Sequence, residues 1–228
     1  MHMRSGDAVL EGVPPGDFEH DGRVPSGPEF EVEGSDTVVY QGYLTMYERK
    51  VRVAPGDGRE ARTVRYDVLG NPRVAYQFVA VFPYDPERKT VTLVREYAQG
   101  DDCMCYALPT GGFDPKKHAD LEAAAVAELS EEARLVGGHL QRLIPPSHPG
   151  FLEAKWCRNR CIPFLCVAPD RDHNPGQRDA EEAGMQVVDV RVDNGDLDKL
   201  LATGLILPPS VVTIGMALSA LRKQGHTV

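Results

Sequence analysis

The 228-residue sequence has no run of about 18 apolar residues, so it contains no segment typical of a membrane-spanning helix. Its first residues, Met1-His2-Met3, lack the apolar core of a secretory signal peptide. Basic residues are the minority, 25 against 34 acidic residues, which gives a net charge of −9. Because such a chain repels a nucleic-acid backbone, we expect no nucleic-acid partner, and the missing apolar segments predict no membrane partner either.

Cysteine is scarce, and the five cysteines show no spacing typical of structural zinc sites. An odd number in a chain of this size favours free thiols, and therefore the cytoplasm or another reducing compartment. Cys103-x-Cys105 and Cys157-x3-Cys161 are alternative zinc ligands. The simpler interpretation is that these thiols are buried or half-buried.

The composition changes twice along the chain, and no internal repeat is present. Residues 1–36 are rich in Gly, Pro, Asp and Glu without periodicity, which predicts an extended arm with little core. Residues 37–74 alternate between apolar and polar positions and predict a small antiparallel sheet. Residues 75–228 mix strand and helix patterns around one sheet, so the predicted fold class is α/β (α+β), a sandwich with a mixed sheet.

The pattern of apolar residues places the elements of this sandwich. The near-continuous apolar run of residues 78–82 predicts a central strand that is buried on both faces. Asp120 is a candidate N-cap for a helix that runs to about Leu135, with Gly137-Gly138 as its stop. Further helices are expected over residues 197–203 and 210–223. Strands are expected at residues 38–44, 45–53, 61–68, 76–83, 90–96, 105–108, 161–168 and 185–192.

The helix after Asp120 carries the most informative group of charges. Glu128, Glu131 and Glu132 are spaced i, i+3, i+4, so their carboxylates share one side of the helix. The apolar stripe of this helix consists of Leu121, Ala125, Leu129 and Ala133. A solvated acidic face is the simplest interpretation of such a cluster. However, Glu128 and Glu132 fall at the edge of the apolar stripe, where a carboxylate needs a partner. Oxygen ligands of this kind suit Mg²⁺ or Mn²⁺.

A glycine loop, Pro109-Thr110-Gly111-Gly112, precedes this helix and follows a predicted strand. Gly111 and Gly112 let main-chain amides and carbonyls approach a ligand closely, because they have no side chain. Such a loop is weak evidence alone, and its place between a strand and the acidic helix strengthens it.

Together, residues 108–114 and 127–135 resemble the Nudix box, whose pattern is G-x5-E-x7-R-E-U-x-E-E-x-G-U with U aliphatic. Val94-Arg95-Glu96-Tyr97 resembles the strand that precedes the box in ADP-ribose pyrophosphatases of this family. Residues 148–153 resemble their downstream catalytic loop, and the early strands resemble their N-terminal dimerisation sheet.

This resemblance implies a metal-dependent hydrolase of nucleoside diphosphates linked to another group, with ADP-ribose or an ADP-/NDP-sugar as the first choice of substrate. Glu128, Glu132 and the carbonyl of Thr110 would bind Mg²⁺ or Mn²⁺. Glu131 or Glu153 would act as the general base. The residues expected to bind the substrate are Arg95, Gly111 and Gly112, and a homodimer is expected through residues 37–74.

The box also departs from the family pattern. Lys117 stands at the first box Glu, Ala127 replaces the Arg of the R-E pair, and Arg134 replaces the final Gly. Ala107 stands where the related subfamily usually has Glu. These changes keep a second hypothesis open, a catalytically weak or inactive Nudix-fold module that binds a nucleotide or regulates a partner.

Overall fold

The computed structural model describes residues 27, 29–54, 56, 58–178, 180–182 and 184–228. Most of the predicted N-terminal arm, and Pro55 and Asp57 of the turn predicted between two early strands, lie outside these residues. In the described part of the chain, no helix is long and apolar enough to cross a membrane.

The main sheet is mixed, as the sequence predicted, and its central path runs in the order β10-β12-β5-β6-β14. The path consists of β10 (His139–Arg142), β12 (Arg160–Val167), β5 (Gln77–Asp85), β6 (Thr90–Ala98) and β14 (Gln186–Arg191). Only β12 and β5 on this path are parallel, and the other pairs are antiparallel. Shorter strands pair with inner strands of this path, namely β7 (Cys103–Ala107) with β6, β8 (Thr110–Gly112) with β5 and β11 (Phe151–Leu152) with β12.

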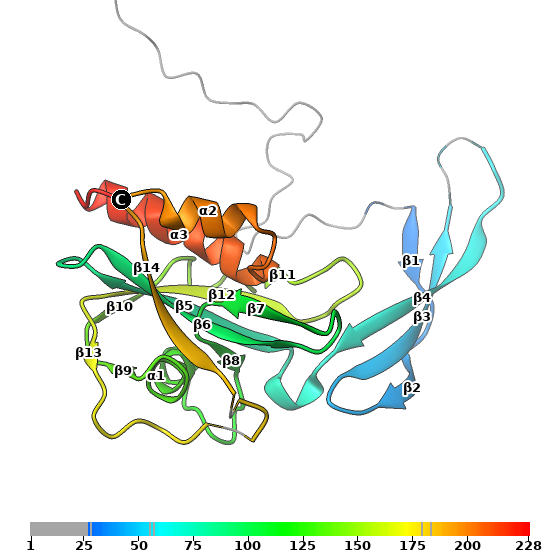
Figure 1. Cartoon of the computed structure of the whole chain (residues 1–228). Coiled ribbons are helices and arrows are strands. Elements are labelled where there is room, and N and C mark those ends of the chain that lie inside the picture. The colour runs from blue at the N-terminus through cyan, green and yellow to red at the C-terminus, as the bar shows by residue number, and fades with distance from the viewer. Residues whose placement is uncertain (1–26, 28, 55, 57, 179, 183) are drawn as a thin grey trace, which may run out of the picture.

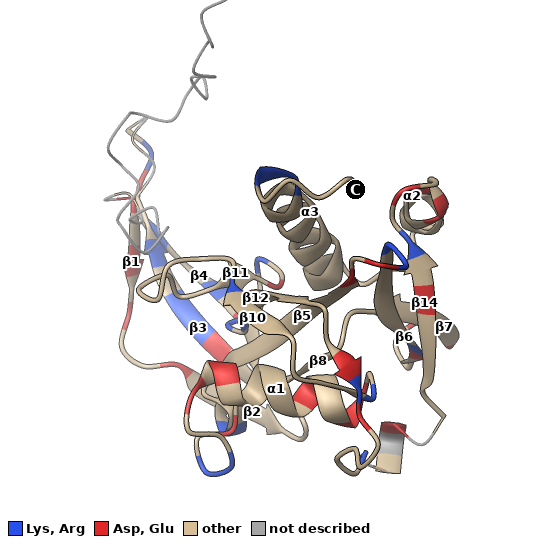
Figure 2. Cartoon of the chain, turned by 90° about the vertical axis from the view of Figure 1, so that its left-hand side faces the viewer, with Lys and Arg blue, Asp and Glu red and all other residues tan. Residues whose placement is uncertain are grey.

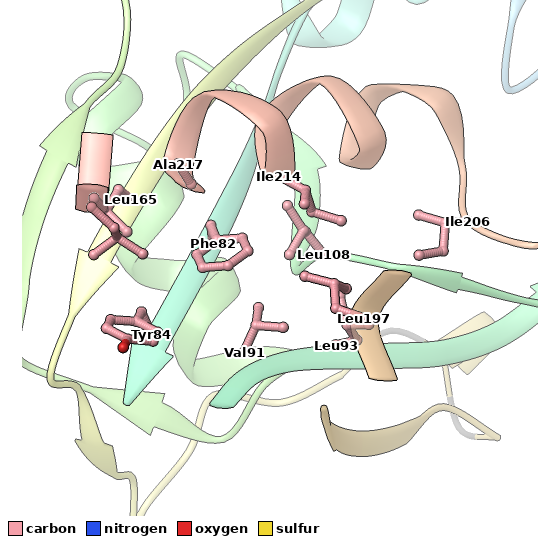
Figure 3. Close-up of a cluster of buried hydrophobic side chains, with 11 residues drawn as sticks. Phe82, Tyr84, Val91, Leu93, Leu108, Leu165, Leu197, Ile206, Ile214 and Ala217 are labelled. Atoms are coloured by element: carbon pink, nitrogen blue, oxygen red, sulfur yellow. The ribbon is translucent and has the colours of Figure 1, made fainter. Parts of the chain in front are cut away.

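Helices cover both faces of this sheet, with α1 (Leu121–Glu131) on one side and α2 (Asp196–Ala202) and α3 (Pro208–Lys223) on the other (Figure 1). Alternation along β5 explains both layers, because Val79 and Val81 pack with the α1 core while Phe82 and Tyr84 pack with the α3 core (Figure 3). Each fully buried side chain of this size contributes about 1.5–3 kcal/mol. The predicted α/β/α sandwich and its doubly buried central strand are confirmed.

A separate antiparallel sheet precedes the sandwich, as predicted. Its central strand is β3 (Thr45–Val53), which pairs with β4 (Arg62–Gly70) on one edge and with β2 (Thr37–Gln41) and β1 (Phe30–Val32) on the other. β1 lies within the segment that the sequence predicted to be an extended arm. Its side chains are exposed, so it adds main-chain pairing without adding core.

Arg158 joins the two sheets. Its guanidinium lies over the rings of Tyr47 and Tyr76, at 5.2 and 4.6 Å from their centroids, and 3.2 Å from a carboxylate oxygen of Asp36. The pKa of Asp36 is lowered, first by its hydrogen bond from Arg49. The main chain of Arg158 also donates to the carbonyl of Leu69 at 2.7 Å, at the end of β4. The segment that follows β11 is therefore fixed to the N-terminal sheet.

Helix α1 begins as predicted and ends earlier than predicted. The side chain of Asp120 accepts a hydrogen bond from the main-chain N–H of Ala123, which confirms the N-cap. The helix stops at Glu131 because Leu135–Val136 forms β9, which pairs with β13 (Asp170–Arg171). The predicted stop at Gly137-Gly138 is wrong, since a short strand with its own partner replaces the last expected helical turn.

Candidate active site

The C-terminal half of α1 faces the glycine loop, which forms β8. The main-chain N–H of Thr110 donates to Oε2 of Glu132 at 2.7 Å. Glu128 lies against the next residue, because a Cβ at Gly111 would overlap the Glu128 carboxylate. Figure 2 shows the acidic positions of α1 as red bands. The fold thus brings together Glu128, Glu132, Thr110 and Gly111, four of the residues expected at the site.

Glu132 is a buried carboxylate, with an exposed fraction of 4%. Burial raises its pKa well above the ordinary value of 4.5, and the charge of Glu128 raises it further. The hydrogen bond from Thr110 opposes this shift without cancelling it. The site therefore holds two close carboxylates in a place where negative charge is poorly solvated, and a cation would relieve that cost.

The carbonyl of Thr110 points to the same side as its N–H. Pro109 accepts a hydrogen bond from Val81 of β5, and Phe113 donates one to Gln77 of β5. Because successive residues of a strand direct their main-chain groups to alternate sides, Thr110 directs both of its groups away from β5. Its N–H reaches Glu132 there, so its carbonyl is available on that side of the strand.

These donors suit a hard divalent cation. Within the described residues, no group of three or more His, Cys, Asp or Glu side chains is placed to hold a metal ion by itself. The set around Thr110 instead combines the carboxylates of Glu128 and Glu132 with a main-chain carbonyl. Mg²⁺ usually keeps several waters and takes only one or two carboxylates, so this set fits it.

Two further carboxylates belong to the same electrostatic cluster. Glu182, in the short helix η2 (Ala180–Glu182), raises the pKa of Glu132 and that of Glu96 through its charge. Glu96 is half-buried on β6, and burial is the main cause of its raised pKa. Neither residue was predicted from the sequence, because neither is close in the sequence to Glu128. The signal available for Glu96 was its place in Val94-Arg95-Glu96-Tyr97, which resembles the strand before the Nudix box.

Arg178 ties the end of α1 to this cluster, and sequence reasoning also missed it. Its guanidinium donates to the main-chain carbonyls of Glu132 and Met185 at 2.6 and 2.7 Å, and to that of Glu131 at 3.2 Å. A cation at a helix C-terminus is stabilising because the last carbonyls carry partial negative charge. Arg178 therefore fixes the helix end although Ala127 replaces the Arg of the box.

A cavity of about 520 Å³ adjoins the glycine loop on its other side. Thr110, Gly111 and Gly112 form one wall, and Glu153 and the start of α3 border it. The carboxylate of Glu153 is held in place, since Oε2 accepts hydrogen bonds from Asn159 Nδ2 at 3.0 Å and from the Cys157 thiol at 3.1 Å. Asn159 is buried and also accepts from the N–H of Asn71. A volume in this range suits a small-molecule ligand.

Among the comparisons with known proteins, the one with solved structures bears on the fold. No protein-family model matches the sequence, and no curated protein matches it. Among solved structures, the chain is similar to the crystal structure of an ADP compounds hydrolase, with a TM-score of 0.62 and 17% sequence identity. The superposition covers 88% of this chain and 98% of that one. The fold is of the Nudix type.

Two other predicted site residues, Glu131 and Arg95, have partners away from the Glu128–Glu132 pair. Glu131 is turned toward the loop at Gly176, where a Cβ would overlap its side chain. Arg95 donates to Gln186 Oε1 at 3.3 Å and does not border the cavity of about 520 Å³. Alternation along β6 places Arg95 and Glu96 on opposite faces of the sheet, so Glu96 is the residue that approaches Glu132.

The cysteines follow the simpler interpretation. Cys105, Cys161 and Cys166 are buried, and Cys103 and Cys157 are half-buried. Burial raises the pKa of Cys161 to about 12 and that of Cys166 to about 11. These protonated thiols therefore serve as small apolar side chains.

Proposed function

We propose that this protein is a Nudix-type pyrophosphohydrolase that cleaves a nucleoside diphosphate linked to another group. ADP-ribose or an ADP-/NDP-sugar is the first choice, and a nucleoside monophosphate and a sugar phosphate are the products. The observation that carries this proposal is the buried Glu132, which is hydrogen-bonded to the glycine loop next to Glu128. The likeness of the fold to an ADP compounds hydrolase supports it.

In this proposal Glu128, Glu132 and the carbonyl of Thr110 hold Mg²⁺ or Mn²⁺. When bound, such an ion neutralises pyrophosphate charge and lowers the pKa of an attacking water. Gly111 and Gly112 let the substrate lie close to the main chain, with the cavity of about 520 Å³ beside them. Arg95 lies on the opposite face from Glu96, so its predicted phosphate contact would need a different side-chain position.

The general base, which takes a proton from the attacking water, is expected among the carboxylates near Glu128 and Glu132. The sequence pointed to Glu131 or Glu153. Glu182 is the better-supported choice, because its charge acts directly on Glu132 and it lies on a short segment between Arg178 and Met185. Glu153 borders the cavity with a fixed carboxylate, which is suited to accept a hydrogen bond from a substrate hydroxyl.

The alternative is a catalytically weak or inactive module that binds a nucleotide diphosphate. Lys117, Ala127 and Arg134 favour it, because the family uses Glu, Arg and Gly at these positions. Arg178 argues against decay of the site, since it holds the end of α1 through the main-chain carbonyls of Glu131 and Glu132.

A panel of nucleotide diphosphates with Mg²⁺ or Mn²⁺ decides between the two hypotheses. We expect metal-dependent release of nucleoside monophosphate from at least one ADP-linked compound. Chromatography of the products measures this release. Glu122→Gln, which alters an exposed glutamate on the same helix, serves as the matched control and should retain full activity. Tight binding of a panel member without turnover would favour the binding module, and neither binding nor turnover would contradict both.

Gly111→Ala tests the contact between the glycine loop and Glu128. The added Cβ displaces the Glu128 carboxylate, which is the flexible end of its side chain, so the fold survives. Because small displacements of a catalytic group are costly, we expect kcat/KM to fall by about 10- to 100-fold and Mn²⁺ affinity to weaken. Gly100→Ala is the control, since nothing lies within 4 Å of its Cβ. Unchanged Mn²⁺ affinity in Gly111→Ala would separate Glu128 from the metal.

We propose further that the protein is a homodimer through the N-terminal sheet. β2 is exposed along its whole length, including Val38, Val39 and Tyr40. An exposed apolar edge strand on a small sheet is unstable alone in water, because it offers unpaired main-chain groups and apolar surface together.

Val38→Asp tests this interface by sedimentation velocity. We expect the wild-type chain to sediment as a dimer and the variant as a monomer, because an interface cannot easily bury an unpaired carboxylate. Val211→Asp is the control, since Val211 is exposed on α3. A wild-type monomer would contradict the proposed dimer. A dimer that Val38→Asp leaves intact would mean that its interface lies elsewhere.

A further inference from the structure

A second cavity, of about 320 Å³, lies beyond the C-terminal end of α1. It shares no lining residue with the cavity beside the glycine loop. We call it the arginine cavity, and its lining residues are Arg88, Thr92, Ala133, Arg134, Leu135, Arg171, Val187 and Asp189.

Positive charge gathers in the arginine cavity although the chain has a net charge of −9. Arg88, Arg134 and Arg171 line it, and Asp189 is the one acidic residue among its described lining residues. The Asp189 carboxylate accepts a hydrogen bond from the hydroxyl of Thr92 at 2.8 Å. Outside the lining, Asp85 lies 3.8 Å from Arg88, and Asp172 lies near Arg134 with its carboxylate bound to Ser130. Neither Arg134 nor Arg171 forms an ion pair with any residue that the structure describes.

Two of these arginines come from neighbouring main-chain segments. Arg171 lies opposite Leu135 in the β13–β9 pair, and the N–H of Asp172 donates to the carbonyl of Arg134 at 2.8 Å. Both guanidinium groups also line the same cavity, and like charges that share a cavity repel each other. An anion between the two guanidinium groups would remove that cost.

Arg134 is also held in an unusual main-chain conformation. Its φ is 61°, in the left-handed region that favours glycine and is costly for a long side chain. The Nudix box has glycine at this position. The side chain is fixed as well, since Nη1 donates to the carbonyl of Gly176 at 2.8 Å. An arginine kept at such a position points to a use for its guanidinium.

We propose that the arginine cavity binds the phosphate group of a small anionic metabolite. Guanidinium groups match phosphate geometry with paired N–H donors, and Arg88, Arg134 and Arg171 approach from separate segments. Ala133, Leu135 and Val187 provide an apolar wall for the carbon part of the ligand. The site is separate from the Glu128–Glu132 pair, so this proposal does not depend on the proposed hydrolase activity.

The test measures phosphate binding by the full-length protein with a chelator present, which keeps phosphate from binding through a metal. Inorganic phosphate is titrated at constant ionic strength, and main-chain NMR shifts of Ala133, Leu135 and Val187 are followed. We expect saturable shifts, with at least tenfold weaker binding in Arg134→Gly and in Arg171→Gln. A nucleoside monophosphate titrated in parallel distinguishes a free phosphate site from one for a phosphate ester.

Arg134→Gly also guards against loss of folding, because glycine adopts the positive φ freely and should leave the melting temperature equal or higher. Arg52→Gln and Arg65→Gln remove exposed arginines of the N-terminal sheet and should bind phosphate like the wild type. Equal affinity in wild type and both cavity variants would overturn the proposal. So would shifts that sodium chloride reproduces at the same ionic strength.

Discussion

Glu128→Gln and Glu132→Gln are each expected to lower kcat/KM by about 10³- to 10⁴-fold, because each removes a charged ligand of the proposed metal. Mn²⁺ affinity should fall in parallel. Glutamine keeps the size of the side chain and can still accept the N–H of Thr110, so the fold should be retained. Activity within a few-fold of wild type in both variants would contradict the proposed metal site.

The same Glu132→Gln variant, which should lose activity, is predicted to gain stability. Burial raises the pKa of Glu132 in the folded protein above its value of 4.5 in the unfolded chain. The folded state therefore binds the proton more tightly. This contribution to stability is fully present below about pH 4.5 and is lost as the pH rises through the raised pKa.

With a chelator present to remove metal ions, Glu132→Gln should therefore melt at a higher temperature than the wild type at a pH above the raised pKa of Glu132. The difference should shrink as the pH falls through the raised pKa and approach zero below about pH 4.5, where the wild-type residue is protonated in both states. Scanning calorimetry between pH 4.5 and 8 measures it, with Glu122→Gln as the control for loss of one exposed charge. A constant difference across this range would mean that Glu132 has no raised pKa.

Glu182→Gln is expected to lower kcat by about 10²- to 10³-fold while leaving Mn²⁺ affinity close to wild type, because loss of a general base slows proton transfer. Glu153→Gln should act differently, raising KM and changing kcat little, since Asn159 holds its carboxylate at the edge of the cavity. The full pH–rate profile of each variant is the measurement. Glu182→Gln should lose the dependence of the rate on the ionisation of a carboxylate.

The two variants also separate the three candidate bases. If Glu153→Gln loses kcat and Glu182→Gln does not, the base is Glu153, one of the two residues that the sequence predicted, and Glu182 contributes only to the local electrostatic potential. If both variants keep their kcat, Glu131→Gln becomes the next test. Asn159→Ala should reproduce the effect of Glu153→Gln on KM, because it removes the hydrogen bond that positions that carboxylate.

The sequence predicted the order of elements because apolar periodicity reports directly on burial. The run at residues 78–82 became the doubly buried strand β5, and the stripe through Ala125 and Leu129 became the buried face of α1. Asp120 capped that helix, since the N-cap hydrogen bond forms within four residues. Local chemistry of this kind needs no knowledge of distant segments.

The sequence also places the metal-binding candidates close together. Glu128 and Glu132 share a helix face at a spacing of four residues, and a short connection leads from the glycine loop to that helix. Their meeting with Thr110 and Gly111 therefore follows from local geometry and the Nudix resemblance. The burial of Glu132, and the direction of its pKa shift, required the packed sheet.

Only the tertiary structure decided which other charges belong to the site. Glu96 and Glu182 reach Glu132 because β6 and the segment before β14 are neighbours in the sheet, although the two residues are far apart in the sequence. Arg178 reaches the end of α1 from the segment after β13. The pairing of β13 with β9 places Arg171 opposite Leu135, where it lines the same cavity as Arg134. Such contacts depend on strand pairing and loop paths, which side-chain periodicity does not encode. For this reason the sequence by itself determined the fold class and the carboxylate pair, and the folded chain determined their electrostatic surroundings.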